Sequence, residues 1–257
     1  MSSSAATFHV AIPARRGSTR LPGKVLAPIM GKPMLQWVHE RACASGTRSV
    51  WIATDDPAIV AAAAAFGAQV RLTSAAHASG TDRIAELAAL EGWPEADIVV
   101  NVQADEPLIP PALIRQVAGL LACDPQAAIA TLATPVQSLE EFLDPNAVKV
   151  VSGAQGRALY FSRAPIPWNR DGAPAGLESQ RVFAGARRHV GIYAYRVGAL
   201  RRLAALAPTP LEQAEKLEQL RALAHGLPIR VADAEEPPGP DVNTAEDLER
   251  VTALLSR

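Results

Sequence analysis

Between residues 8 and 136, apolar segments of strand length alternate with helix-like segments, and this alternation restricts the possible folds more than any other feature of the sequence. Such alternation is typical of a parallel sheet with helices on both faces. The expected strands cover residues 8–13, 48–55, 68–72, 96–107 and 127–136, and the expected helices cover residues 33–45, 57–67, 81–92 and 111–123. We therefore expect an α/β fold with a doubly wound, mostly parallel sheet.

The pattern changes after residue 136. Residues 146–171 have the character of a strand, a turn, a second strand and a proline-rich loop, and residues 187–196 of a further strand. We expect one domain over residues 1–257, with a smaller β-rich insert at about 137–200 that caps the sheet's active edge, binds a sugar or supplies a dimer surface. A helix over residues 209–226 that stops at Gly226, a strand at 228–234 and a last helix at 244–255 complete the prediction.

Composition excludes several classes of protein. The 257 residues carry a formal net charge of −1 and only 5% aromatic residues, which argues against a nucleic-acid-binding domain. Cys43 and Cys123 form no metal-binding pattern and are expected to be free thiols in a reducing compartment. Residues 1–7 lack the features of a secretion signal, and no apolar run is long enough to span a membrane. The expected location is the cytoplasm.

A short basic loop, residues 11–24 (AIPARRGSTRLPGK), directly follows the first expected strand. It is neither a Walker A motif nor a dinucleotide-binding fingerprint. Its glycines allow close backbone approach to a ligand, and Arg15, Arg20 and Lys24 supply positive charge. In such sheets ligands collect at the carboxyl ends of the strands. The loop is therefore predicted to bind an anion, most simply a phosphate.

Two carboxylates end the strand of residues 96–107. Asp105 and Glu106 could cap the helix that follows, since acidic groups favour the positive end of a helix. A carboxylate facing a phosphate loop could equally hold Mg²⁺. Together with the basic loop, the metal interpretation is favoured for Asp105, and a structural role is left open for Glu106.

Eight segments in order along the chain resemble the signatures of the 3-deoxy-D-manno-octulosonate cytidylyltransferase family. They are IPARRGSTRLPGK, HASGTDRIAE, NVQADEP, NAVKVV, ALYFSRAPIPW, RHVGIYAYR, LEQAEKLEQLR and VNTAEDLERV. The resemblance implies a doubly wound nucleotidyltransferase fold, usually in a homodimer, that uses CTP and Mg²⁺. It further implies transfer of the cytidylyl group of CTP to the anomeric hydroxyl of 3-deoxy-D-manno-octulosonate (Kdo). The products would be CMP-Kdo, for lipopolysaccharide biosynthesis, and pyrophosphate.

The resemblance also assigns roles to individual residues. The residues that match nucleotide-binding positions are Arg15, Ser18, Arg20, Lys24, Ser79, Gly80, Thr81, Arg83 and Gln103. Of these, Arg15, Arg20 and Lys24, together with Asp105, are the expected catalytic residues. The residues that match the sugar pocket are Arg163, His189, Tyr193, Glu218 and Gln219. Thr81 could at the same time open the following helix as its cap.

The chain departs from the family pattern at the second expected metal ligand. An aspartate is usual there, and this chain has Asn243. Asp241 lies two residues earlier and could replace it, so the expected ligands are Asp105 with either Asp241 or Asn243. Ala104 stands where the family usually has glycine. Two alternatives stay open: a cytidylyltransferase for another acidic sugar, such as 8-amino-Kdo or a sialic acid, or a catalytically weakened sugar-nucleotide binding protein.

Overall fold

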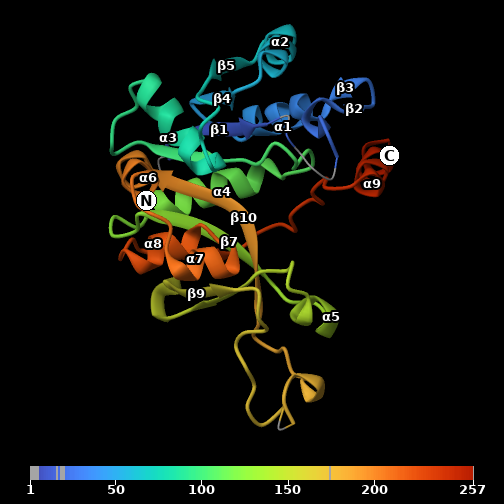
Figure 1. Ribbon diagram of the computed structural model, residues 1–257, viewed down its shortest axis with the longest axis vertical. Helices are drawn as coiled ribbons and strands as arrows, with labels where there is room; N and C mark the ends of the chain where they lie inside the picture. Colours follow the sequence, from blue (N-terminus) through green and yellow to red (C-terminus); the bar gives the residue numbers. More distant parts are fainter. Residues whose placement is uncertain (1–5, 16, 18–20, 174, 257) are drawn as a thin grey trace, which may run out of the picture.

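A large, mostly parallel sheet forms the centre of the computed structural model, which describes residues 6–15, 17, 21–173 and 175–256 (Figure 1). Its main strands lie in the order β11-β7-β10-β6-β1-β4-β5. They are β1 (Phe8–Ala14), β4 (Ser49–Thr54), β5 (Gln69–Leu72), β6 (Ile98–Asn101), β7 (Ile129–Pro135), β10 (Arg187–Arg196) and β11 (Ile229–Asp233). β10 runs antiparallel between β6 and β7, whereas the other pairs in this order are parallel. The predicted α/β fold with a mostly parallel sheet is confirmed.

Helices cover both faces of the sheet because its strands are apolar on both sides. In β1, Val10 and Ile12 pack on one face, whereas Ala11 packs on the other. The first face is covered by α1 (Met34–Cys43), α2 (Pro57–Ala65), α4 (Pro111–Ala122) and α9 (Ala245–Leu255). The second face is covered by α3 (Gly80–Leu90), α6 (Val197–Ala204) and α8 (Gln219–Ala224). Two hydrophobic cores therefore hold the sheet from either side, as the continuous apolar character of the strands predicts.

The region at 137–200 extends the same sheet. It contains α5 (Leu139–Leu143), β8 (Lys149–Ser152), a 3-10 turn η2 (Ala154–Gly156), β9 (Ala158–Ser162), a second 3-10 turn η3 (Leu177–Ser179) and β10. β8 and β9 form an antiparallel pair that joins β10 where Arg188 pairs with Lys149. The segment between β9 and β10 reaches away from the sheet, in the lower part of Figure 1. β10 itself belongs to the centre of the sheet.

The expected helix over residues 209–226 is wrong as one continuous element. The structure has α7 (Pro210–Glu215) and α8, separated at Lys216, whose φ of 53° is left-handed. A buried ion pair joins the two short helices, with Arg221 Nε donating to Glu212 Oε2 at 2.8 Å. The break turns residues 216–219 toward the interior rather than along a helix surface. Gly226 follows α8 with a φ of 69°, as the predicted stop requires.

Helix caps correct one further expectation. Ser79, and not Thr81, caps α3: its hydroxyl accepts from the Asp82 backbone N–H, and the Asp82 carboxylate accepts from the Ser79 N–H. Neither Asp105 nor Glu106 caps α4, which begins after Pro110 without a side-chain cap. Helix capping is therefore excluded as the role of these two carboxylates.

The smaller elements lie near the first loop. η1 (Lys24–Leu26) is a 3-10 turn, and β2 (Pro28–Ile29) pairs with β3 (Lys32–Pro33) before α1 begins.

Among the described residues, no helix is both long and apolar enough to cross a membrane.

Candidate active site

Two adjoining hollows lie where the central strands end. The basic hollow, of about 380 Å³, is lined by Pro13, Arg15, Gly17, Lys24, Val25, Gly80, Gln103, Ala104, Asp105 and Asn243. The inner hollow, of about 200 Å³, is lined by Gly80, Thr81, Asn101, Gln103, Ile129, Tyr193, Tyr195, Leu203, Lys216, Leu217, Glu218 and Gln219. Gly80 and Gln103 line both, so the hollows share a wall. This is the sheet edge at which parallel α/β folds place their ligands.

The ammonium of Lys24 lies among oxygen atoms in the basic hollow. Its Nζ donates to Asp105 Oδ2 at 2.7 Å, to the Val242 carbonyl at 2.9 Å and to Asn243 Oδ1 at 3.3 Å. Gly23, with a φ of 71°, provides the left-handed turn from which η1 presents this side chain. The structure thus brings together three residues that the sequence placed in the phosphate and metal site.

Asp241 and Asn243 occupy different places around this cluster. The Asn243 amide oxygen faces Lys24, while its Nδ2 donates to the Asp241 carboxylate. Asp241 is therefore behind Asn243 relative to the Lys24 ammonium. The geometry favours Asn243 as the residue that faces a cation, with Asp241 holding its amide in that orientation.

The Glu106 carboxyl is buried beside the same cluster. Burial, with the negative charges of Asp105 and Asp241 adding to it, raises the pKa of Glu106 to about 8. Its Oε2 atom has no hydrogen-bond partner among the described residues. Without a bound cation, the raised pKa favours the neutral form of the Glu106 carboxyl at pH 7.

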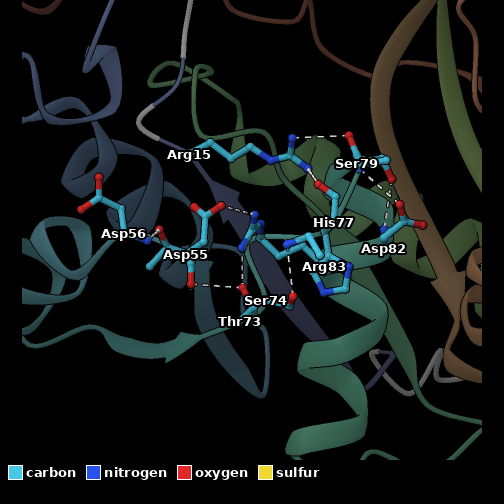
Figure 2. A network of polar contacts seen from close by, with 12 residues as sticks. Arg15, Asp55, Asp56, Thr73, Ser74, His77, Ser79, Asp82 and Arg83 are labelled. Carbon is cyan, nitrogen blue, oxygen red and sulfur yellow. Dashed lines mark hydrogen bonds and ion pairs between the residues drawn. The ribbon is translucent and has the colours of Figure 1, made fainter.

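Arg15 links the first loop to the segment before α3. Its guanidinium donates to the His77 carbonyl at 3.0 Å and to the Ala78 carbonyl at 3.4 Å (Figure 2). Gly80 then brings the start of α3 close to β1, because a Cβ at this position would come within 3.2 Å of Pro13 Cγ. Two other predicted residues of the loop, Ser18 and Arg20, lie outside the described residues.

Arg83 lines neither hollow. Its side chain is fully buried, and its guanidinium donates to Thr73 Oγ1 and, at 2.9 Å, to Asp55 Oδ2 (Figure 2). It thereby joins α3 to the ends of β4 and β5. In this structure Arg83 supports the start of α3, the segment that carries the predicted nucleotide-binding residues Ser79, Gly80 and Thr81.

The inner hollow combines residues expected at the nucleotide with residues expected at the sugar. Gly80, Thr81 and Gln103 form one side, and Tyr193, Glu218 and Gln219 belong to the same lining. Burial raises the pKa of Glu218, and polar contacts with the Thr81 and Ser79 hydroxyls partly oppose the shift. Sequence analysis missed Asn101, Tyr195 and Lys216. The only signal for Asn101 was a polar residue directly after the apolar run of its strand.

Arg163 and His189 lie outside the lining of both hollows. Arg163 is held by Glu215: its Nε donates to the Glu215 carbonyl at 2.6 Å, and its backbone N–H donates to Oε2 at 2.9 Å. His189 hydrogen-bonds Thr131 Oγ1 at 2.9 Å, and its ring centre lies 5.2 Å from that of Tyr193. The two residues therefore adjoin Lys216 and Tyr193, which line the inner hollow, without lining it themselves.

Burial of the His189 ring makes fold stability depend on pH. Burial, helped by the positive charge of Arg188, lowers the pKa of His189 to about 3. The unfolded chain binds a proton there below about pH 6.5 while the folded chain does not, so stability falls as pH drops from that value toward 3. We expect His189→Gln to flatten this part of the profile in thermal unfolding between pH 7 and 4. An unchanged slope would contradict the burial of the neutral ring.

The chain is similar to known cytidylyltransferases. A profile of the family described as "Cytidylyltransferase" matches residues 9–230. The chain is 54% identical over 250 residues to the 3-deoxy-manno-octulosonate cytidylyltransferase of Thioalkalivibrio sulfidiphilus, covering 97% of this chain and 99% of that protein. It is also 54% identical over 250 residues to that of Pseudomonas syringae pv. syringae, with coverages of 97% and 98%.

A solved structure shows the same architecture. CMP:2-keto-3-deoxy-manno-octonic acid synthetase complexed with CTP is similar with a TM-score of 0.86 and 42% sequence identity, over 98% of this chain and 99% of that one. A cytidylyltransferase from Leptospira borgpetersenii shares the fold at a TM-score of 0.64 and 18% identity, over 98% of this chain and 87% of that one.

Proposed function

This chain belongs to the 3-deoxy-manno-octulosonate cytidylyltransferase family, and we propose that it transfers the cytidylyl group of CTP to the anomeric hydroxyl of Kdo. The observation that carries the proposal is the pair of adjoining hollows. One holds the positive charge of Arg15 and Lys24, as a triphosphate requires, and the other is lined by hydroxyl, amide and carboxyl groups that suit a polyhydroxylated sugar acid. Their shared wall, Gly80 and Gln103, is the place where the two substrates would meet.

The reaction is an in-line displacement at the α-phosphorus of CTP. The anomeric oxygen of the sugar forms a bond to this phosphorus, the hydroxyl proton is released, and the bond to the bridging oxygen of the β-phosphate breaks. Pyrophosphate leaves with the electron pair of that bond. Such chemistry depends mainly on positioning and on neutralising charge. Lys24 and Arg15 supply positive charge, and the start of α3 offers backbone N–H groups and hydroxyls for the nucleotide.

The oxygen atoms around Lys24 form a donor set that fits Mg²⁺. Asp105 offers a carboxylate, Val242 a carbonyl and Asn243 an amide oxygen, and all three already face a positive charge. Hard cations prefer such oxygen ligands. We assign Asp105 and Asn243 as the residues that would hold the ion, with Asp241 behind Asn243. When bound, Mg²⁺ would neutralise phosphate charge and favour ionisation of the sugar hydroxyl.

Two further expectations remain proposals. The segment between β9 and β10 exposes Trp168 and Leu177, and neighbouring strand β9 exposes Leu159, so this end of the molecule has apolar side chains that a homodimer could cover. Light scattering of the purified chain tests the dimer, and a monomer at micromolar concentration would contradict it. A cytoplasmic location also stays a prediction, which cell fractionation tests.

Pyrophosphate release tests the proposed function directly. We expect release with Mg²⁺, CTP and Kdo, and none when CTP is replaced by ATP, GTP or UTP. Lys24→Ala should lower kcat/KM by about 100-fold or more, because a charge that faces the phosphates is lost. Lys32 serves as the matched control in Lys32→Ala, because its half-buried ammonium is also paired with a carboxylate, that of Glu40, but lines neither hollow.

The other outcomes separate the alternatives. Release with CTP and 8-amino-Kdo or a sialic acid, but not with Kdo, would keep the phosphate chemistry and overturn the sugar assignment. CTP binding by a folded protein without release for any sugar would support the weakened binding protein.

Mg²⁺ titrations separate the two candidate ligands. If Asn243 holds the ion and Asp241 orients it, Asn243→Ala and Asp241→Ala should each raise the half-maximal Mg²⁺ concentration by about 10-fold or more. The double variant should be little worse than either single variant, and Asn243→Asp should lower the concentration. If Asp241 were the ligand instead, Asn243→Ala would behave as wild type. Glu249→Ala, an exposed carboxylate on α9, is the control.

A further inference from the structure

Asn101 presents a buried polar atom that the protein itself does not satisfy. It is the last residue of β6, its relative exposure is 3%, and it lines the inner hollow. Its Oδ1 atom has no hydrogen-bond partner in the part of the chain that the structure describes. Buried acceptors without partners are rare because each one loses its hydration without replacement. This atom therefore requires an explanation, and the hollow beside it offers one.

The sheet fixes the direction of this side chain. Asn101 pairs with Ala11 of β1 on one side and with Tyr193 of β10 on the other. Val99, two residues earlier and on the same face of the strand, packs into the core beneath α3 and α6. The amide therefore points to the face that carries the inner hollow. It cannot turn to the other face without breaking the register of β6.

An irregularity in the neighbouring strand lies beside Asn101. The register between β10 and β7 shifts between Val190 and Tyr193. Thr131 holds this irregularity in place, because its hydroxyl donates to the Ile192 carbonyl at 2.7 Å. Such bulges re-aim side chains and are frequent beside active sites. Here the shift precedes Tyr193, the cross-strand partner of Asn101 in the lining of the hollow.

We propose that Asn101 is a specificity-determining residue whose amide accepts a hydrogen bond from a hydroxyl of the sugar acid. The inference rests on the proposed function and adds a residue to its sugar site. Asn101 lines the inner hollow together with Tyr193 and Glu218 and does not line the basic hollow. A hydroxyl suits this position, because it can donate to the amide oxygen and can also accept from the amide nitrogen.

Replacement by an apolar side chain of similar size tests the inference. In Asn101→Leu we expect an unchanged or higher Tm, because an unsatisfied buried acceptor is removed. The kcat/KM for Kdo should fall by about 10-fold or more while the KM for CTP stays unchanged. The rise in Tm that Kdo produces in the wild type should also shrink, which reports binding without turnover.

Deoxy analogues of Kdo identify the hydroxyl. The wild type should discriminate against one of them, whereas Asn101→Leu should treat that analogue and Kdo nearly alike. Asn101→Ala serves as a second variant if leucine does not fit the hollow, and the same loss of discrimination is expected. Ser45→Ala is the matched control: Ser45 is buried and its hydroxyl donates to the Ala42 carbonyl at 2.6 Å, so this change should lower Tm and leave Kdo kinetics unchanged.

The opposite results would overturn the inference. A lower Tm in both Asn101 variants, with discrimination among the analogues retained, would make Asn101 a structural residue. A raised KM for CTP with an unchanged KM for Kdo would place the amide at the nucleotide. If the wild type neither uses Kdo nor gains Tm from it, the proposed function itself fails, and the inference fails with it.

Discussion

The contacts of one ammonium group hold the proposed reaction centre together. Lys24 follows β1, Asp105 follows β6, and Val242 and Asn243 precede α9, yet oxygens of these last three residues all accept hydrogen bonds from Lys24 Nζ. The parallel strands β1 and β6 make this possible because they end at the same edge of the sheet. Lys24, which is proposed to neutralise the charge of a triphosphate, is thus paired with Asp105 in the structure.

The inner hollow depends on a different feature, the antiparallel strand β10. In a purely parallel sheet, β6 and β7 would be neighbours and their ends would be closed by packed side chains. Inserting β10 between them brings Tyr193 and Tyr195 beside the end of β6. The break between α7 and α8 adds Glu218 and Gln219 to the same lining. The inner hollow is therefore formed where the regular α/β pattern is interrupted twice.

These interruptions mark the limit of what the sequence could predict. The alternation of strands and helices over residues 8–136 predicted the architecture. The charged residues of the first loop and of the segment after β6 predicted the position of the basic hollow. The break at Lys216 could not be predicted, because residues 209–226 keep a helical pattern in which nothing marks Lys216 as left-handed. In the structure the Glu212–Arg221 ion pair joins the two short helices across the break. Arg83 shows the reverse case: the family resemblance assigned it to the nucleotide, but its guanidinium is buried and pairs with Asp55 and Thr73, which directly follow β4 and β5.

The end of β6 also differs from the rest of the interior in how its polar atoms are satisfied. Elsewhere in the described part of the chain, buried side-chain oxygens have partners, such as Ser45 Oγ with Ala42 and Thr131 Oγ1 with Ile192. The buried atoms without a partner there are nitrogens, such as Arg201 Nε. Asn101 Oδ1 and Glu106 Oε2, five residues apart in sequence, have no partner among the described residues. Both lie beside the space where substrates are proposed to bind. Leaving acceptors unsatisfied lowers fold stability, and sequences retain such groups where a ligand completes the hydrogen bonds. We therefore expect this edge of the sheet to be most stable in the complex with both substrates. The sugar hydroxyls then supply hydrogen bonds that the buried acceptors cannot obtain from water.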